Sequence, residues 1–317
     1  MYPLFYEIIL LVVFLGVMVF GAHLAVESIS NFSKIVGLSE LSAGLVIVSL
    51  STSLPEVMVS VLSATSGKIG IAVGDVFGSN VTNIALIAGL LMFITPVKTI
   101  HGEISSKLSR ELLIASVIPV LLLIVPADSR LVGLVLLVLF AYFTYSTLHS
   151  DWKYPKPPGI SGSKIRELIF FAIGIAVVII SARIVVDSAS SIAVETGLRE
   201  SIIGASIIAL GTSLPELSVD IISVRKRHLD LAFGDIIGSC VMNMTLVLGI
   251  ALVLSSITTD FRILTSMISF AILAPLLMFF FIRSAKISKW QGLLLLVLYL
   301  VFISVVYEIQ FVIGGIV

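Results

Sequence analysis

The sequence predicts an all-α polytopic membrane protein with ten transmembrane helices, arranged as two inverted five-helix repeats with broken helices at the centre. Three observations predict this fold class. Of the 317 residues, 58% are hydrophobic and 12% are charged, and the mean hydropathy is +1.20, whereas a soluble domain is about half apolar and about a quarter charged. A segment of the chain recurs at an offset of 160 residues. Each copy carries a proline and a glutamate within very apolar sequence.

The apolar segments divide the chain into ten predicted spans. A transmembrane helix needs about 20 mostly apolar residues, and ten segments fit this length. The predicted spans are residues 4–27, 41–65, 69–95, 109–126, 129–149, 165–188, 201–224, 229–255, 262–282 and 290–314. The longest polar connection, residues 150–164, contains several prolines and glycines, which favour a flexible linker. It separates a first five-span repeat, residues 1–149, from a second, residues 165–317.

The two halves share an internal repeat whose cores are residues 44–89 and 204–249. Over the first 13 positions of these cores, eight residues are identical without a gap. Each half holds an odd number of spans, so the second half must cross the membrane in the opposite direction to the first. Inverted repeats are common in secondary transporters, where broken helices form the ion site near the bilayer midplane. Closely spaced glycines in the cores, such as Gly74 and Gly78, would let helices approach closely.

The basic residues predict the orientation of the chain in the membrane. If the N-terminus is outside, 14 of the 19 Lys and Arg residues lie on the inner side. Cytoplasmic loops carry an excess of Lys and Arg. We therefore predict a multi-pass protein of the plasma membrane, surrounded by the lipid bilayer, with both termini extracellular and the linker 150–164 in the cytoplasm.

The centre of each repeat is the sequence Thr-Ser-Leu-Pro-Glu, at residues 52–56 and 212–216. Proline has no N–H and clashes with the carbonyl four residues earlier, so Pro55 and Pro215 should each break a helix and free backbone carbonyls. Such groups are tolerated at membrane depth only where something satisfies them, and a bound cation would do so. An ionisable residue within a span is itself a candidate functional residue.

Other oxygen-bearing side chains accompany the two glutamates at helical spacing. Thr52 and Thr212 lie four residues before Glu56 and Glu216, on the same helix face. In the next span of each repeat, polar residues recur every four positions: Asp75, Ser79 and Asn83, and Asp235, Ser239 and Asn243. If the copies meet at a pseudo-two-fold axis, they form a site of hard oxygen ligands. Such a site suits Ca²⁺, which takes 6–8 oxygens, and Na⁺ could use the same atoms.

Two features leave alternatives open. Ser53 and Ser213, each followed three positions later by glutamate, also fit a capping box that restarts a kinked helix. Asp75 and Asp235 are either ligands or residues at helix ends in contact with water. They lie two helical turns, about 12 Å along the axis, from the asparagines of the same spans, which places them nearer a vestibule than the centre of the site.

The composition excludes several other functions. The single cysteine, Cys240, allows no internal disulfide, and the four scattered histidines provide no Cys/His metal site. The net charge of zero gives no indication of a nucleic-acid partner. No nucleotide-binding loop or catalytic arrangement is evident. The sequence therefore predicts no enzyme, no cofactor and no obligate protein partner.

The paired motifs, each followed by Gly-Asp-x-x-Gly-Ser-x-x-x-Asn, resemble the α-repeats of the cation/calcium exchanger superfamily. The ten-span plan is similar to that of its prokaryotic Na⁺/Ca²⁺ exchangers. The resemblance implies a secondary antiporter that exchanges Ca²⁺ for Na⁺ by alternating access, with spans one and six sliding across the other eight. It implies a calcium site formed by Thr52, Glu56, Thr212 and Glu216. It also implies sodium-site or central-site ligands at Ser49, Ser53, Ser79, Asn83, Ala209, Ser213, Ser239 and Asn243, with Ser49 and Ala209 contributing their carbonyls.

Several positions depart from the family pattern. Ser51 stands where glycine is usual, Asp75 and Asp235 where asparagine is frequent, and Asn243 where well-known members carry aspartate. Loss of that acid lowers the negative charge available to sodium, which leaves the coupling ion open between Na⁺ and H⁺. One alternative is therefore a Ca²⁺/H⁺ antiporter on the same scaffold, since buried glutamates can carry protons. A passive cation channel lined with acids and carbonyls is a further alternative, but an inverted repeat with broken helices favours a transporter.

Overall fold

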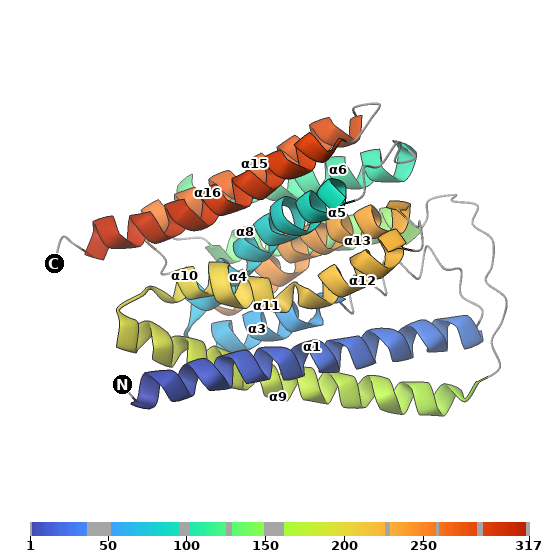
Figure 1. The fold of residues 1–317 in the computed structure, drawn as a ribbon, viewed down its shortest axis with the longest axis horizontal. Helices are drawn as coiled ribbons and strands as arrows, with labels where there is room; N and C mark the ends of the chain where they lie inside the picture. Colours follow the sequence, from blue (N-terminus) through green and yellow to red (C-terminus); the bar gives the residue numbers. More distant parts are fainter. Residues whose placement is uncertain are drawn as a thin grey trace.

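The computed structural model describes residues 2–36, 52–94, 102–124, 129–148, 162–225, 229–257, 260–283 and 288–314, and in these ranges every regular element is a helix (Figure 1). The first half contains α1 (Tyr2–Val36), α3 (Leu54–Thr65), α4 (Ile69–Val81), η1 (Thr82–Ala88), α5 (Gly89–Ile94), α6 (Gly102–Val117), η2 (Ile118–Val120), α7 (Leu121–Ile124) and α8 (Ser129–Leu148). The second half contains α9 (Lys164–Thr196), α10 (Glu200–Ile203), η4 (Gly204–Ile208), α11 (Ala209–Thr212), α12 (Leu214–Arg225), α13 (Leu229–Met242), η5 (Asn243–Val247), α14 (Leu248–Leu254), α15 (Phe261–Arg283) and α16 (Lys289–Gly314). The predicted all-helical fold is confirmed for this part of the chain.

Eight helical segments are long and apolar enough to cross a membrane, and they coincide with eight of the ten predicted spans. The second predicted span, 41–65, is described only from Thr52 onward, where it forms α3. The fourth, 109–126, corresponds to α6, η2 and α7 and is not one continuous helix, because Pro119 interrupts the regular helix with a tight turn. The count of ten spans and the division at 150–164 stay predictions, and most of that linker lies outside the described residues.

Helices α1 and α9 run side by side in opposite directions (Figure 1). The Asn31 amide donates a hydrogen bond to Glu167 at 3.5 Å, and Gly174 lies directly against Ala25. Residues that come later in α1 thus meet residues that come earlier in α9. The helices contain 35 and 33 residues, or about 50 Å each at 1.5 Å per residue. This length exceeds a hydrocarbon core of about 30 Å, so both helices must tilt or project beyond it.

The remaining helices form a body that packs around a large apolar core, whose biggest fully buried side chains include Phe77, Phe233 and Phe302. A second apolar cluster joins α1 and α9 to this body, and its members include Leu15, Val185 and Ile208. Helix α4 crosses the centre. A Cβ at Gly74 would collide with the carbonyl of Ser201, and one at Gly78 with the carbonyl of Ala205. The predicted close approach at these two glycines is confirmed.

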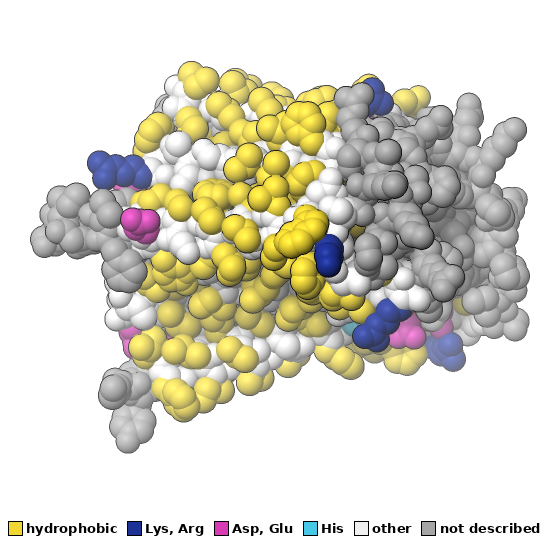
Figure 2. Space-filling model, turned by 45° about the horizontal axis from the view of Figure 1, so that its top comes forward, with side chains coloured by type: hydrophobic (Ala, Val, Ile, Leu, Met, Phe, Trp, Pro, Cys, Tyr) yellow, Lys and Arg dark blue, Asp and Glu magenta, His cyan; other side chains and the backbone are white. Residues whose placement is uncertain are grey.

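The surface is that of a membrane protein. On the face in Figure 2, hydrophobic side chains cover the middle, while Lys, Arg, Asp and Glu lie toward the two ends. Large hydrophobic side chains that are exposed include Phe20, Val138 and Leu300. The start of α1 and the end of α16 lie at the same end of the molecule (Figure 1).

Candidate cation site

A helix break lies at the centre of each Thr-Ser-Leu-Pro-Glu motif. Helix α11 ends at Thr212 and α12 begins at Leu214, and between them Ser213 has φ −82° and ψ 3°. Ser53 has the same geometry, φ −81° and ψ 8°, directly before α3. The breaks predicted from the prolines are thus confirmed. Leu15 of α1 packs directly on Gly211, so α1 crosses the chain beside the second break.

Wide π-helical turns lie next to the site. They comprise η4, η5 and η1, and η5 begins at Asn243 while η1 contains Asn83. Such turns are rare, and they occur often at functional sites. They leave the side chains of Asn83 and Asn243 fully buried between the helices. The sequence did not predict these turns.

Hydroxyl groups from opposite repeats meet at the centre. Ser79 and Thr212 share a hydrogen bond of 3.2 Å, and Thr52 and Ser239 share one of 3.5 Å. Each pair maps onto the other at the repeat offset of 160 residues. The structure therefore brings together the predicted threonines and serines across the interface between the repeats.

Glu56 and Glu216 lie beside these hydroxyls with no exposed surface. The Thr212 hydroxyl is close to Glu56, and the Thr52 hydroxyl is close to Glu216. Even so, within the described ranges neither carboxylate has a hydrogen bond of ordinary distance and angle. A buried ionised carboxylate is costly unless it is paired or hydrogen-bonded. The two glutamates are therefore groups that a bound cation would stabilise.

Asp75 belongs to the same cluster. Its Oδ1 atom accepts hydrogen bonds from Thr212 at 3.0 Å and from Ser79 at 3.4 Å, and the residue is fully buried. The prediction that it lies nearer a vestibule is wrong, because the axial distance along one helix ignores Thr212, which approaches from the other repeat. Asp235 is 1% exposed in the interior of α13, so the expectation of a helix end in contact with water is also wrong.

The capping-box alternative is not supported by the geometry. Ser53 makes no side-chain capping bond, and among the residues that the structure describes its hydroxyl has no hydrogen-bonding partner. The hydroxyl of Ser213 is in the same situation. Both serines are buried at the break, which leaves their oxygens available to a ligand.

The other predicted ligands differ in the hydrogen bonds that they already make. Asn83 and Asn243 have buried amides without a hydrogen-bonding partner in the described part of the chain. The carbonyl of Ala209 already accepts the Ser213 amide at 3.2 Å and the Thr212 hydroxyl at 3.3 Å. Ser49 lies outside the described residues.

One acidic residue was not predicted. Asp220 lies in α12 four residues after Glu216, has no exposed surface, and interacts electrostatically with Asp235 and Glu216. Its equivalent in the first repeat is Ser60, which is also buried. A search for residues shared by the two copies therefore misses Asp220. Its spacing of four from Glu216 within an apolar span is the signal that could have identified it.

The donor set is composed of oxygen. Considering only the described residues, no three acidic, histidine or cysteine side chains converge closely enough to hold a metal by themselves. Hydroxyls, amide oxygens and carbonyls would have to complete the coordination of a cation held by two carboxylates. Ca²⁺ accepts such mixed oxygen ligands in a flexible geometry, so the residues present fit this ion.

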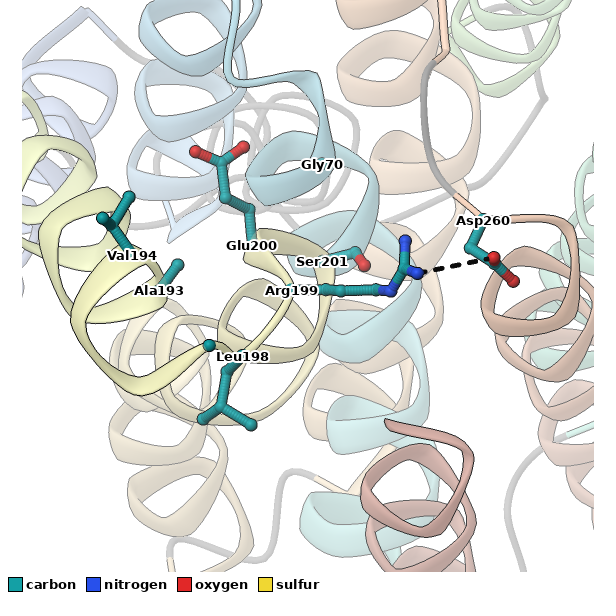
Figure 3. A pocket seen from close by; sticks show the side chains of 9 residues that line it. Gly70, Ala193, Val194, Leu198, Arg199, Glu200, Ser201 and Asp260 are labelled. Atoms are coloured by element: carbon teal, nitrogen blue, oxygen red, sulfur yellow. Dashed lines mark ion pairs between the residues drawn. The ribbon is translucent and has the colours of Figure 1, made fainter. Parts of the chain in front are cut away.

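Two pockets open toward the surface. One, of about 460 Å³, lies at the end of the molecule that holds the start of α1, and Figure 3 shows Arg199 reaching toward Asp260 in it. These two side chains form an ion pair of 3.7 Å. The other, of about 290 Å³, lies between α1 and α12 beside His23 and Pro215. The second pocket therefore adjoins the helix that carries Glu216.

Comparison with known proteins agrees with this geometry. The family model described as sodium/calcium exchanger protein matches residues 6–148 and 166–308. The inner membrane protein YrbG of Escherichia coli is 34% identical over 254 residues, covering 76% of this chain and 78% of YrbG. The sodium/calcium exchanger MaX1 of Methanosarcina acetivorans is 26% identical, covering 94% of this chain and 98% of MaX1. A solved structure of the sodium-calcium exchanger NCX_Mj aligns with a TM-score of 0.66 and 25% identity, covering 95% of this chain and 99% of that one.

Proposed function

The chain belongs to the sodium/calcium exchanger family, and from this premise we propose that it is a secondary active antiporter that exchanges Ca²⁺ for Na⁺. The observation that most supports the proposal is the burial of Glu56 and Glu216 beside hydroxyl pairs from opposite repeats. Two carboxylates match the charge of one Ca²⁺, which would offset the cost of burying them. MaX1 and NCX_Mj, which cover nearly the same length, are named as sodium/calcium exchangers.

The proposed calcium site consists of Thr52, Glu56, Thr212 and Glu216. Sodium ions would use the neighbouring oxygens of Ser53, Ser79, Asn83, Ser213, Ser239 and Asn243, with the carbonyls of Ser49 and Ala209. The Ala209 carbonyl would have to exchange an existing hydrogen bond for the ion. Asp75, which accepts a hydrogen bond from Thr212, would hold that hydroxyl in place for coordination.

Alternating access in this proposal is a movement of α1 and α9 against the body. The two helices are joined to the body by a separate apolar cluster, and their antiparallel course is that expected of equivalent helices in inverted repeats. Leu15 packs on Gly211 beside the helix break. A shift of α1 would therefore uncover or cover the site. We further propose that the protein lies in the plasma membrane with both termini outside.

A Ca²⁺/H⁺ antiporter is the second candidate, and Asn243 favours it. This amide occupies the position of an acid in well-known exchangers, and it is buried next to the site. Without that acid, the central site holds less negative charge to stabilise several sodium ions. Glu56 and Glu216 would then exchange Ca²⁺ for protons.

Calcium uptake into proteoliposomes tests the proposal. The vesicles receive either an outward sodium gradient at equal pH or an outward proton gradient without sodium. We expect radioactive Ca²⁺ to accumulate under the sodium gradient alone, and to a much smaller extent with E56Q/E216Q protein. Uptake under the proton gradient alone would establish the second candidate. No uptake above protein-free vesicles under either gradient would overturn both.

A further inference from the structure

Asp220 is a buried carboxylate that has no role in the proposed exchange mechanism. It has no exposed surface, and in the part of the chain covered by the structure neither of its oxygens has a hydrogen-bonding partner. Burying an ionised carboxylate in this way is costly, and a bound ion is one explanation for such a group. It interacts electrostatically with Asp235 on α13 and with Glu216 on α12. Helices α12 and α13 pack against each other, and Asp235 is also buried.

The repeat relation shows that Asp220 is not needed for the symmetric centre. Its equivalent is Ser60 of α3, which is fully buried and whose hydroxyl has no hydrogen-bonding partner among the described residues. The first repeat thus combines Asp75 with a serine, whereas the second combines Asp235 with another carboxylate. Among the residues described as buried after each motif, the second repeat therefore has two aspartates on α12 and α13, and the first repeat has one on α3 and α4.

Asp220 lies to one side of the centre. Helix α12 leads away from the break at Ser213 and ends at Arg225, and Figure 1 shows it running toward the end of the molecule opposite the start of α1. Asp220 therefore lies about 6 Å along the helix axis beyond Glu216, at 1.5 Å per residue. In the orientation that we propose, this is the cytoplasmic side of the site.

We propose that Asp220 and Asp235 hold a second cation between the central site and the cytoplasmic end of the molecule. The ligand is a hard, oxygen-preferring cation, which on the proposed exchange function is Ca²⁺ or Na⁺. Carboxylates are the preferred protein ligands of such ions. Because the first repeat carries Ser60 instead of the acid, the opposite side of the centre lacks this second site, and the ion pathway is asymmetric.

Equilibrium binding of radioactive Ca²⁺ and Na⁺ to the purified full chain tests this site. The variants are D220N, D220E and the matched control S60A, each first checked for a single monodisperse species in detergent. We expect D220N to lower the number of ions bound at saturation by one per chain, for Ca²⁺ or for Na⁺, while the midpoint of the remaining binding stays within about threefold. D220E and S60A should keep the wild-type number. The ion whose stoichiometry falls identifies the occupant.

The outcomes separate this inference from the exchange function on which it rests. Unchanged stoichiometry and midpoints for both ions in D220N would overturn the second site, even if E56Q/E216Q had lost calcium binding. Loss of binding in S60A to the same extent as in D220N would also overturn it, because the effect would then follow from packing rather than from charge. Failure of the exchange function itself would appear instead as wild-type calcium binding that E56Q/E216Q leaves intact.

Discussion

The two repeats are alike in their hydroxyl contacts and differ in their acids. Ser79 meets Thr212, and in the equivalent place Thr52 meets Ser239. The position one turn after the motif glutamate, however, is Ser60 in the first repeat and Asp220 in the second. The hydroxyl contacts between the halves are therefore symmetric, while the distribution of buried acids around them is not. An exchanger must bind and release ions on two sides that differ in ion concentration, and with the second site that we propose such an asymmetry would give the two sides different affinities.

The largest effect is expected when either motif glutamate loses its charge. E56Q and E216Q should each lower calcium transport at least about 100-fold, because removing one partner of a buried charge arrangement costs several kcal/mol and about 1.4 kcal/mol is a factor of ten. Initial rates in proteoliposomes measure this effect. Similar losses in the two variants would confirm a symmetric centre, whereas a near-normal rate in either would remove that residue from the site.

A smaller effect is expected at the threonines. Thr212 donates to Asp75 at 3.0 Å, and a hydrogen bond to a charged group contributes about 1.5–3 kcal/mol. T212A should therefore weaken the apparent calcium affinity about tenfold. T52A should also weaken this affinity, and both threonine variants should have a smaller effect than the glutamate variants. T212S, which retains the hydroxyl, is the control. A threonine variant less active than both glutamate variants would show that side-chain charge is not the main determinant.

Asn243 allows charge to be added to the second repeat. N243D places a carboxylate beside the site, so the variant should bind sodium severalfold more tightly or couple more sodium ions to each calcium. A sodium titration of calcium exchange gives both the midpoint and the Hill slope, and N243Q controls for the change in shape. Identical titrations of wild type and N243D from pH 6 to 9 would show that this position does not control sodium occupancy.

The smallest effect is expected at an ion pair that joins α9 to the loop between α3 and α4. Lys68 and Asp187 are 2.8 Å apart, and their side chains are 22% and 47% exposed. Ion pairs of this kind contribute about 0–1 kcal/mol, so K68M should change the transport rate less than about fivefold. Salt should reduce the difference between K68M and wild type. A tenfold or greater change would show that this contact controls the movement of α9.

The sequence predicted the features that depend on local backbone chemistry. The helix breaks follow from Pro55 and Pro215, and the close approach of α4 follows from Gly74 and Gly78. It predicted eight spans that the structure confirms by length and hydropathy. The central residues were found because they recur in both copies, and the same criterion excluded Asp220, whose counterpart is a serine.

Contacts between distant parts of the chain could not be predicted in this way. Asp75 was assigned to a vestibule from its spacing along one helix, although the group that it contacts, Thr212, comes from the other repeat. The π-helical turns η1 and η5 begin at nearly equivalent positions of the two repeats, Thr82 and Asn243, and the spacing of polar residues did not predict them. Sequence spacing gives positions along a helix, whereas the site is formed across helices.

Anomalous diffraction from crystals soaked with Sr²⁺, which stands in for Ca²⁺, tests the central site most directly. We predict a strong peak between Glu56 and Glu216, with carboxylate oxygens at roughly the 2.3–2.6 Å typical of calcium sites or slightly longer. The peak should vanish in E56Q/E216Q crystals of the same form. A transport-competent protein whose only strong peak lies elsewhere, for example between Arg199 and Asp260, would contradict the proposed site.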